Sequence, residues 1–238
     1  NGVGKTNILE AISMLVPGRG FRRAKFSELS RRPDLIGWRV SAILKILSKT
    51  YEICTSWDEA SNRKVTIDGK SASQSDLGRL VRVLWITPQM DRIWLDGSAE
   101  RRRFLDRIVS TLEPDHTENS IQYYKALKQR NRLIKDRVSD PIWYKSLEWQ
   151  MAVSGNAIDI ARHSVICQIM AMQKNSHSSF PAANLSLIGA TYESAKEFQD
   201  ALSSSRTSDI YAGRTLIGPH LTDLGSVYSS KSIDAKSC

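Results

Sequence analysis

The sequence predicts an α/β fold that carries an antiparallel β-meander and an inserted antiparallel helical hairpin. Residues 38–73 alternate between apolar and polar and meet a hairpin turn signal at Asp68-Gly69. Two long segments with apolar residues every third or fourth position, 117–138 and 141–172, are joined by a short proline turn. Mixed helix and strand patterns return after Pro181. We therefore predict a head domain formed by residues 1–110 and 181–238, with a helical hairpin arm at 111–180.

The first element is a glycine-rich turn that leads into an amphipathic helix. Asn1-Gly2-Val3-Gly4-Lys5-Thr6 precedes apolar residues at helical spacing, which predict one buried helix face, and Pro17-Gly18 ends the helix. The apolar residues of that face are Ile8, Leu9, Ile12 and Leu15. Gly4-Lys5-Thr6 matches the end of the phosphate-binding loop Gly-x-x-x-x-Gly-Lys-Ser/Thr. We expect the first glycine of this loop to lie two positions before Asn1.

This turn has the residues that a triphosphate site needs. Gly2 and Gly4 allow the backbone N–H groups to point at phosphates, and the start of the helix adds a positive dipole end. Lys5 would place its ammonium against the β- and γ-phosphates, and the Thr6 hydroxyl would ligate Mg²⁺. We therefore predict binding of a nucleoside triphosphate, ATP with Mg²⁺, by Asn1, Gly2, Val3, Gly4, Lys5, Thr6 and Asn7.

The later elements follow from the same periodicities. The apolar stripe of the first arm helix is predicted to be structural, and so is that of the second. Val81 to Thr87 is continuously apolar enough to predict a buried strand of a central sheet. The first stripe is Tyr124, Leu127, Asn131, Ile134 and Val138, and the second is Leu147, Met151, Ile158, Ala161 and Val165. Beyond the arm we expect a strand at 185–190, a helix at 194–202, a short loop at 203–208 and a final edge strand at 226–233.

Composition and charge limit the classes of function. The net charge is +9, and the basic residues concentrate in the windows 19–32, 101–107 and 125–137. Such clusters suit a polyphosphate partner such as DNA, although solvated helix faces would give the same pattern. No apolar run is long enough for a membrane helix. Cys54, Cys167 and Cys238 form neither a disulfide framework nor a zinc spacing, which favours a cytoplasmic protein without a membrane partner.

Histidines and carboxylates give no second catalytic pattern. His116, His163 and His177 lack metal-ligand spacing, and no Ser/His/Asp arrangement stands out. His220 lies beside Gly218-Pro219, where it would either face the nucleotide or have a structural role.

Several collinear motifs resemble the RecF family of bacterial recombination and gap-repair ATPases. The phosphate loop and its Ile-Leu-Glu-Ala-Ile helix are similar to those of ABC-type and SMC-type ATPases, and the next segment is similar to RecF itself. The matching segments span the chain: Pro17-Gly18-Arg19-Gly20-Phe21-Arg22-Arg23-Ala24, Thr87-Pro88-Gln89-Met90-Asp91, 101–107 (RRRFLDR), 129–135 (QRNRLIK) and 214–220 (RTLIGPH). The resemblance implies an ABC/SMC-like P-loop ATPase head with a helical hairpin subdomain.

The resemblance also implies a function and partners. It implies an ATP-dependent homodimer that clamps DNA at single-stranded regions or their junctions with duplex. It further implies that the protein helps RecO and RecR to load RecA during gap repair, replication maintenance and SOS induction. Gln89 would act as a Q-loop residue at the γ-phosphate, unless it is an ordinary polar loop residue. We place the DNA-phosphate contacts at Arg19, Arg22, Arg23, Arg101 and Arg102.

The sequence departs from the family pattern at two places. Leu221 and Thr222 replace an arginine and an aspartate of the family motif, while Asp223 and Leu224 are kept. The chain also ends at Cys238, about where the family's signature segment and Walker B aspartate would follow. We expect weak DNA-stimulated ATPase activity of the full-length protein, and no turnover by this fragment, with no catalytic residue of its own.

Two other classes of protein remain as alternatives. A phosphate-loop kinase or other small-substrate phosphotransferase would need an acceptor pocket, and it gives no reason for the meander, the arm and the clustered arginines. The head of a Rad50-like or SMC-like complex would carry a coiled-coil insertion of hundreds of residues, whereas each arm helix here has about twenty to thirty.

Overall fold

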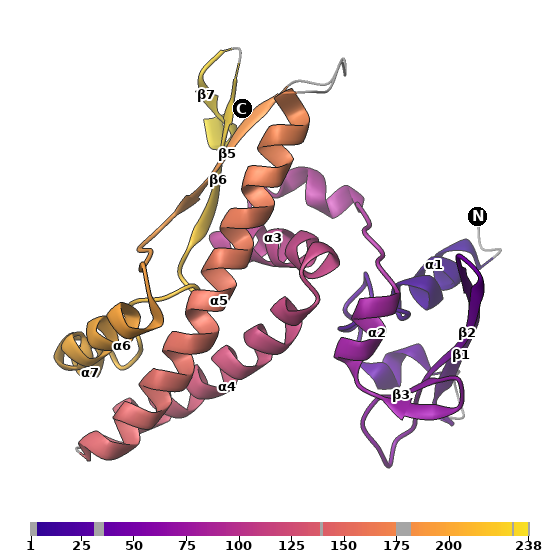
Figure 1. The fold of residues 1–238 in the computed structure, drawn as a ribbon, viewed down its shortest axis with the longest axis horizontal. Coiled ribbons are helices and arrows are strands. Elements are labelled where there is room, and N and C mark those ends of the chain that lie inside the picture. The colour runs from indigo at the N-terminus through magenta and orange to yellow at the C-terminus, as the bar shows by residue number, and fades with distance from the viewer. Residues whose placement is uncertain (1–3, 31–35, 139, 175–181, 230, 238) are drawn as a thin grey trace. The chain divides into compact units, whose positions relative to one another are not determined.

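The chain forms two compact units, Asn1–Trp85 and Ile86–Cys238 (Figure 1). The computed structural model describes residues 4–30, 36–138, 140–174, 182–229 and 231–237. The unit boundary lies at residues 85 and 86, whereas the sequence-based division placed its first boundary at 110. The reason is that α3 (Ser98–Leu112) packs against α5 (Pro141–Lys174) and β6 (Asp223–Tyr228), and therefore joins the second unit.

The first unit is built on the predicted β-meander. Four antiparallel strands of the described chain pair in the order β1-β2-β3-β4. Asp68 and Gly69 both have positive φ, 50° and 74°, as a tight turn between β3 and β4 requires. One face of the sheet contributes Ile53 and Val65 to a core that α2 closes with Leu77. The elements are α1 (Lys5–Ser13), η1 (Phe26–Leu29), β1 (Trp38–Ile46), β2 (Lys49–Trp57), β3 (Lys64–Ile67), β4 (Lys70–Ala72) and α2 (Gln74–Leu80).

The helix after the glycine-rich turn forms, but its predicted buried face is wrong for this chain. Ile8 is 62% exposed and Leu9 and Ile12 are exposed too, whereas Glu10 and Ser13 are buried. Leu15, beyond the helix end, does join the core. The polar side of the helix faces residues 18–21, because the Ser13 hydroxyl accepts a hydrogen bond from the Phe21 amide.

The strand predicted at 81–87 is also wrong. The segment is extended at Val81, with φ −118° and ψ 122°, yet no strand among the described residues pairs with it. Its side chains alternate between buried and more exposed, and Val81, Val83 and Trp85 pack on the core of the first unit. Apolar composition therefore indicated that alternate side chains here are buried, but it could not show that the segment lacks a paired strand among the described residues.

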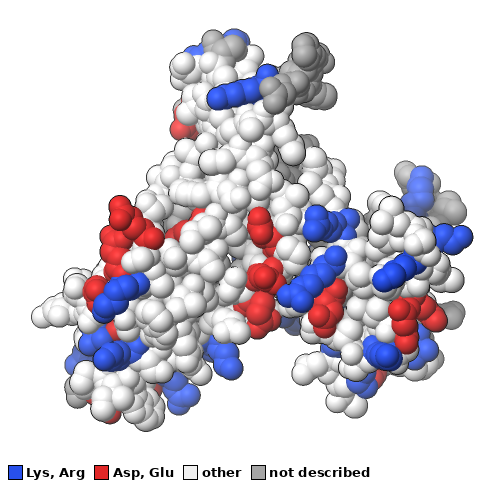
Figure 2. Space-filling model, viewed as in Figure 1, with Lys and Arg blue, Asp and Glu red and all other residues white. Residues whose placement is uncertain are grey.

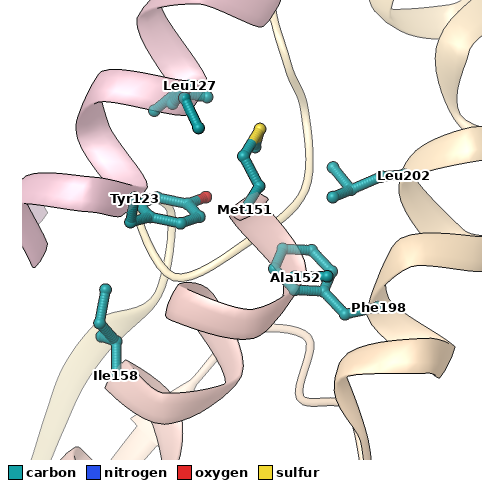
Figure 3. Close-up of a cluster of buried hydrophobic side chains, with 8 residues drawn as sticks. Tyr123, Leu127, Met151, Ala152, Ile158, Phe198 and Leu202 are labelled. Atoms are coloured by element: carbon teal, nitrogen blue, oxygen red, sulfur yellow. The ribbon is translucent and has the colours of Figure 1, made fainter. Parts of the chain in front are cut away.

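The second unit contains the predicted helical hairpin. Helices α4 (Asp115–Lys135) and α5 lie side by side and antiparallel (Figure 1). Figure 3 shows how α6 (Ala195–Ser204) packs on them: Phe198 and Leu202 of α6 point toward Tyr123 of α4 and Met151 of α5. The other elements are η2 (Pro88–Arg92), β5 (Ala183–Ile188), α7 (Arg206–Ala212), β7 (Ile233–Asp234) and η3 (Ala235–Ser237).

The predicted stripe of α5 is confirmed, and that of α4 is confirmed at Leu127 and Ile134 but not at Tyr124. Met151, Ile158 and Val165 of α5 are all buried. On α4, Tyr123 is buried while Tyr124 is half exposed, although Leu127 and Ile134 lie in the core as expected. Tyr123 takes the inner position because its hydroxyl reaches His220 Nδ1 at 2.7 Å.

Two predictions near the C-terminal end need correction. Residues 203–208 are mostly helical, because α6 extends to Ser204 and α7 begins at Arg206. The predicted edge strand at 226–233 is two strands, β6 and β7. Strand β6 is central, since it pairs antiparallel with β5 on one side and β7 on the other.

Candidate nucleotide and phosphate-binding sites

The glycine-rich turn ends where the motif predicts, at the N-terminus of α1. Gly4 is the N-cap in the left-handed conformation, with φ 81° and ψ 6°, which a side chain would disfavour. The amides of Asn7 and Ile8 donate to the Gly4 carbonyl, so the helix begins at Lys5. The first N–H groups of a helix have no partner within it, and they point toward any anion placed at this end.

The functional side chains of this turn face solvent. Lys5, Thr6 and Asn7 are exposed, and Gly4 is partly exposed. An ammonium, a hydroxyl and the amides at the start of the helix therefore lie at one accessible helix end, which suits a polyphosphate and its Mg²⁺. Asn1, Gly2 and Val3, which were predicted to complete this site, lie outside the described residues.

The segment after α1 folds back onto the helix through a close glycine contact. Gly20 has φ 70°, and a Cβ built there would lie 2.5 Å from Glu10 Oε1 and 2.8 Å from Ser13 Oγ. The Phe21 amide donates to Ser13 Oγ at 3.0 Å. Only glycine satisfies both the backbone conformation and the space, so this contact fixes the path of the basic segment that follows.

Arg63 holds the other side of this fold-back. Its guanidinium donates to the carbonyls of Met14 and Gly18, at 2.5 and 2.6 Å, and to Thr55 Oγ1 at 2.8 Å. A cation at the C-terminal end of α1 also complements the helix dipole. Burial lowers the pKa of Arg63 to about 10, so the side chain stays charged at neutral pH.

Three arginines predicted to contact DNA lie on this folded-back segment. Arg19, Arg22 and Arg23 are all exposed. Arg22 lies over the Phe21 ring and 3.8 Å from the buried carboxylate of Glu10. Burial raises the pKa of Glu10, and the Arg22 charge opposes that shift. The segment thus presents positive side chains to solvent on a fixed backbone.

The arginines of α3 differ from what the sequence suggested. Arg101 is only 5% exposed, and it pairs with both carboxylate oxygens of Asp223 at 2.7 and 2.9 Å. It also donates to the carbonyls of Ile93 and Asp96. A phosphate contact by Arg101 does not fit this position. Arg102 is partly exposed and donates to the Thr222 carbonyl at 3.0 Å.

The Gly-Pro-His segment is tied to the arm by a second arginine–aspartate pair. Arg162 of α5 binds Asp106 of α3 at 2.8 and 3.0 Å and donates to the Pro219 carbonyl. Burial acts to raise the pKa of Asp106, but hydrogen bonds from His116 and Arg162 outweigh it and lower that pKa. This pair anchors the turn that carries His220.

His220 has a structural environment. Its Nδ1 lies 2.7 Å from the Tyr123 hydroxyl and its Nε2 lies 3.3 Å from the Thr215 carbonyl. Burial lowers the pKa of His220 to about 4, so the ring is neutral at neutral pH. In that state Nε2–H donates to the carbonyl and Nδ1 accepts from the tyrosine. Of its two sequence-based interpretations, these contacts match the structural one.

A fully buried charged network was missed at the sequence level. Arg130 donates to Asp209 Oδ2 at 2.6 Å, to Glu148 Oε1 at 3.2 Å and to Thr215 Oγ1 at 2.8 Å. The Asn131 side chain accepts from the Thr215 amide at 2.8 Å. The sequence could have indicated that Arg130 is buried, because it lies three residues after Leu127 and four before Ile134, on the apolar face of its helix.

Gln89 belongs to the second unit, in η2, and its side chain lies outside the described atoms. Its predicted role at the γ-phosphate stays a prediction. Within the described ranges, no group of three His, Cys, Asp or Glu residues is arranged to hold a metal ion. None of the described helices has the length and apolar character that crossing a bilayer requires.

The chain is similar along its whole length to curated repair proteins. It is 37% identical over 252 residues to the DNA replication and repair protein RecF of Rhizobium meliloti (strain 1021), covering 100% of this chain and 67% of that protein. It is 39% identical over 253 residues, with the same coverage, to RecF of Mesorhizobium japonicum (strain LMG 29417 / CECT 9101 / MAFF 303099). No protein-family model matches the sequence.

The fold is similar to solved structures of the recombination mediator protein RecF in the RecFOR pathway. The RecF-ATP structure matches with a TM-score of 0.84 and 22% identity, covering 99% of this chain and 66% of that one. The RecF-ATPrS structure matches with a TM-score of 0.83 and 22% identity, covering 95% and 65%. The chain thus spans about two thirds of the length of these proteins, and the predicted ABC/SMC-like fold class is confirmed. Because the curated relatives are 37% and 39% identical to this chain across its full length, the chain belongs to the RecF family of DNA replication and repair proteins.

Proposed function

We propose that this chain is part of an ATP-switched DNA-binding protein of recombinational gap repair and replication. The observation that carries the proposal is the left-handed Gly4 at the start of α1, followed by exposed Lys5 and Thr6, in a chain of the RecF family. The curated relatives are DNA replication and repair proteins, and one similar solved structure is RecF-ATP.

The nucleotide site is proposed at the start of α1. The amides of residues 1–7 and the Lys5 ammonium would hold the phosphates of ATP, and the Thr6 hydroxyl would ligate Mg²⁺. Bound Mg²⁺ would neutralise phosphate charge. Turnover would also require a carboxylate that anchors the metal and positions the attacking water.

The DNA contacts are proposed on the exposed arginines. Arg19, Arg22 and Arg23 share one short segment held against α1 by Gly20 and Arg63, so their charges act together on a phosphate backbone. Arg102 is also proposed to contact a DNA phosphate, and because it is only partly exposed we expect a smaller contribution from it. Arg101 is omitted, since its guanidinium is bound to Asp223.

The whole protein is proposed to use ATP to form a homodimer that clamps DNA at single-stranded regions or junctions with duplex. Such a switch uses nucleotide binding to favour one conformation. It would act in the cytoplasm with RecO and RecR, help to load RecA and support SOS induction. Support comes from the family of the chain and from the RecFOR pathway in which the similar solved structures are placed.

The nucleotide site is tested by titrating the chain with Mg²⁺ and a fluorescent ATP analogue. Replacing Lys5 by Ala should weaken binding at least tenfold, because the main cation of the site is removed. Lys45→Ala, which removes an exposed lysine of β1, is the matched control and should leave affinity unchanged. Equal affinity of the Lys5→Ala variant and the unchanged chain would reject the proposed site.

The DNA contacts are tested with single-stranded and gapped DNA across a salt series. Replacing Arg19, Arg22 and Arg23 together by Ser should weaken binding and lower the slope of log affinity against log salt by about 1 for each phosphate that is no longer neutralised. A triple replacement of Arg39, Lys45 and Lys49 removes the same charge from exposed positions in the same unit. If both triple variants weaken binding equally, the effect reflects net charge only, and the arginine segment does not touch the DNA.

A further inference from the structure

An apolar groove opens at the end of the helical hairpin, where α4 leads into α5. Its volume is about 710 Å³, and its apolar lining comes from both helices and the turn between them: Leu133, Val138, Ile142, Trp143 and Leu147. Leu133 belongs to a small buried cluster with Ile134 and Tyr144, so the floor of the groove is part of the packed hairpin. Within the second unit this end points away from the sheet β5-β6-β7 (Figure 1).

The groove holds large apolar side chains that the hairpin itself does not cover. Ile142 is 74% exposed and Trp143 is 62% exposed. Both lie in the first turn of α5, which Asp140 fixes by accepting from the Ile142 amide at 2.8 Å. A tryptophan next to a preformed apolar recess is the arrangement found at interface hot spots, where a partner's apolar side chain is buried.

One basic residue, Arg132, lines the groove, and it belongs to a basic face of α4. Lys128, Arg132 and Lys135 are exposed on α4, and together with Lys125 they recur at intervals of three, four and three residues, which places them along one helix face. Arg137 is exposed just beyond the helix end. At the lower left of Figure 2, Lys and Arg side chains of the second unit lie among uncharged residues, with Asp and Glu side chains beside and above them. Asp136, which pairs with Arg132 at 3.5 Å, is the acidic group that lines the groove.

We propose that this arm-tip groove binds an acidic peptide segment of a partner protein, which inserts aliphatic or aromatic anchors beside Trp143. The basic face of α4 complements acidic residues flanking the anchors, and the apolar recess accepts the anchors themselves. Single-stranded nucleic acid fits less well. Bases stack on successive aromatic faces, whereas Trp143 is the one aromatic residue of this lining and the Asp136 carboxylate would repel phosphates.

The proposal is tested by selecting peptides from a random twelve-residue phage-display library on the immobilised full chain. Enriched peptides are synthesised with a fluorescent label, and their affinity is measured for the unchanged chain and for variants. Trp143→Ala is the test variant. Trp149→Ala is its matched control, because Trp149 is an exposed tryptophan of the same helix, 47% exposed, that does not line the groove. Arg132→Glu is compared with Lys174→Glu, an exposed charge at the other end of α5.

We expect enriched peptides to carry net negative charge and at least one large apolar residue. Their affinity should fall at least tenfold with Trp143→Ala and with Arg132→Glu, and stay within twofold with both controls. Circular dichroism should show unchanged helix content for all four variants. The proposal is overturned if no peptide is enriched, if the enriched peptides bind Trp143→Ala as well as the unchanged chain, or if Trp143→Ala instead abolishes binding of oligothymidylate. ATP and DNA binding, measured in parallel, should be unaffected by Trp143→Ala, which separates this result from the proposed function.

Discussion

At the scale of single residues, arginine–carboxylate contacts connect the elements of the second unit. Arg101 links α3 to β6 through Asp223, Arg162 links α5 to α3, and Arg130 links α4 to α7. Their sequence separations reach 122 residues for the Arg101–Asp223 pair. Charged groups buried in this way are costly unless they are paired and hydrogen-bonded, so each pair defines a specific arrangement of its two elements.

The Arg130 network gives the sharpest stability prediction. Arg130, Glu148 and Asp209 are all fully buried, so Arg130→Ala would leave Asp209 without its cationic partner inside the protein. We expect the free energy of unfolding to fall by about 3–5 kcal/mol in a urea titration. Arg132→Ala, two residues further along α4 but exposed, should change it by less than about 0.5 kcal/mol. If Arg130→Ala lowered the free energy of unfolding as little as Arg132→Ala does, the network would add no stability.

Two buried groups near the Gly-Pro-His segment predict opposite pH dependences. Burial raises the pKa of Asp159 to about 6, and its Oδ1 has no hydrogen-bond partner among the described residues. Its contribution to stability therefore disappears as pH rises from about 4 to 6. Burial lowers the pKa of His220 to about 4 from its usual 6.5, so its contribution disappears as pH falls through the same range.

Replacing Asp159 by Asn should therefore reveal the pH dependence of stability that His220 causes. The two slopes oppose each other in the unchanged chain, and without Asp159 stability should rise with pH between 4 and 6.5. Above pH 6 the variant should be more stable by up to about 3 kcal/mol, which corresponds to a pKa difference of two units. Urea titrations of both proteins at pH 4, 5, 6 and 7 measure this. An unchanged difference between the two proteins at all four pH values would contradict the assignment.

At the scale of elements, the sequence pattern predicted those helices and strands that are stabilised by interactions between residues close together in the chain. The meander and the arm were predictable because alternation, an Asp-Gly turn and helical spacing are visible within a few residues. Helix α7 was not predictable from the serine-rich 203–208 stretch. It is held by Asp209, which accepts from Ser205 and from Arg130, a residue 79 positions away.

The same contrast holds for the candidate site. Gly4, Lys5 and Thr6 form a local motif, and the structure places them at a helix start as predicted. The burial of Arg101 could not be predicted, because its partner Asp223 is distant in sequence and a run of arginines looks alike whether it is buried or exposed. The exposed face of α1 likewise shows that helical spacing identifies an apolar face without identifying what covers it.

Packing between helices gives an element-scale prediction at Gly155. A Cβ at this position of α5 would lie 2.6 Å from the Phe198 ring and 3.1 Å from the Tyr123 ring, both fully buried. Gly155→Ala should therefore push α6 away from the arm and cost about 1–3 kcal/mol in thermal or urea unfolding, more than the gain in helix propensity. Gly97→Ala, where a Cβ meets nothing within 4 Å, is the control; because Gly97 is the N-cap of α3, this change should cost less than about 1 kcal/mol, through the cap alone. A stabilised Gly155→Ala variant would contradict this packing.

At the scale of the whole molecule, the described core residues divide cleanly between the two units. The core around Ile53, Val65 and Leu77 lies within Asn1–Trp85. The cores around Tyr123 and Met151, around Leu105 and Val165, and around Leu133 and Tyr144 all lie within Ile86–Cys238. Each unit has the size of an ordinary domain and a core of its own, which are the properties expected of an independently folding part.

We therefore expect the 238-residue chain to unfold in two separable thermal transitions, resolved by differential scanning calorimetry. Leu77→Ala removes a fully buried side chain of the first unit, and Met151→Ala removes one of the second. Each should lower the midpoint of one transition only, because a core truncation costs about 2–5 kcal/mol in the unit that contains it. The shift should be larger for Leu77→Ala, since a smaller unit has a smaller unfolding entropy and its midpoint moves further for the same decrease in stability. If both substitutions shift a single shared transition, the two units fold as one cooperative body, and the division at residues 85 and 86 describes their packing but not their stability.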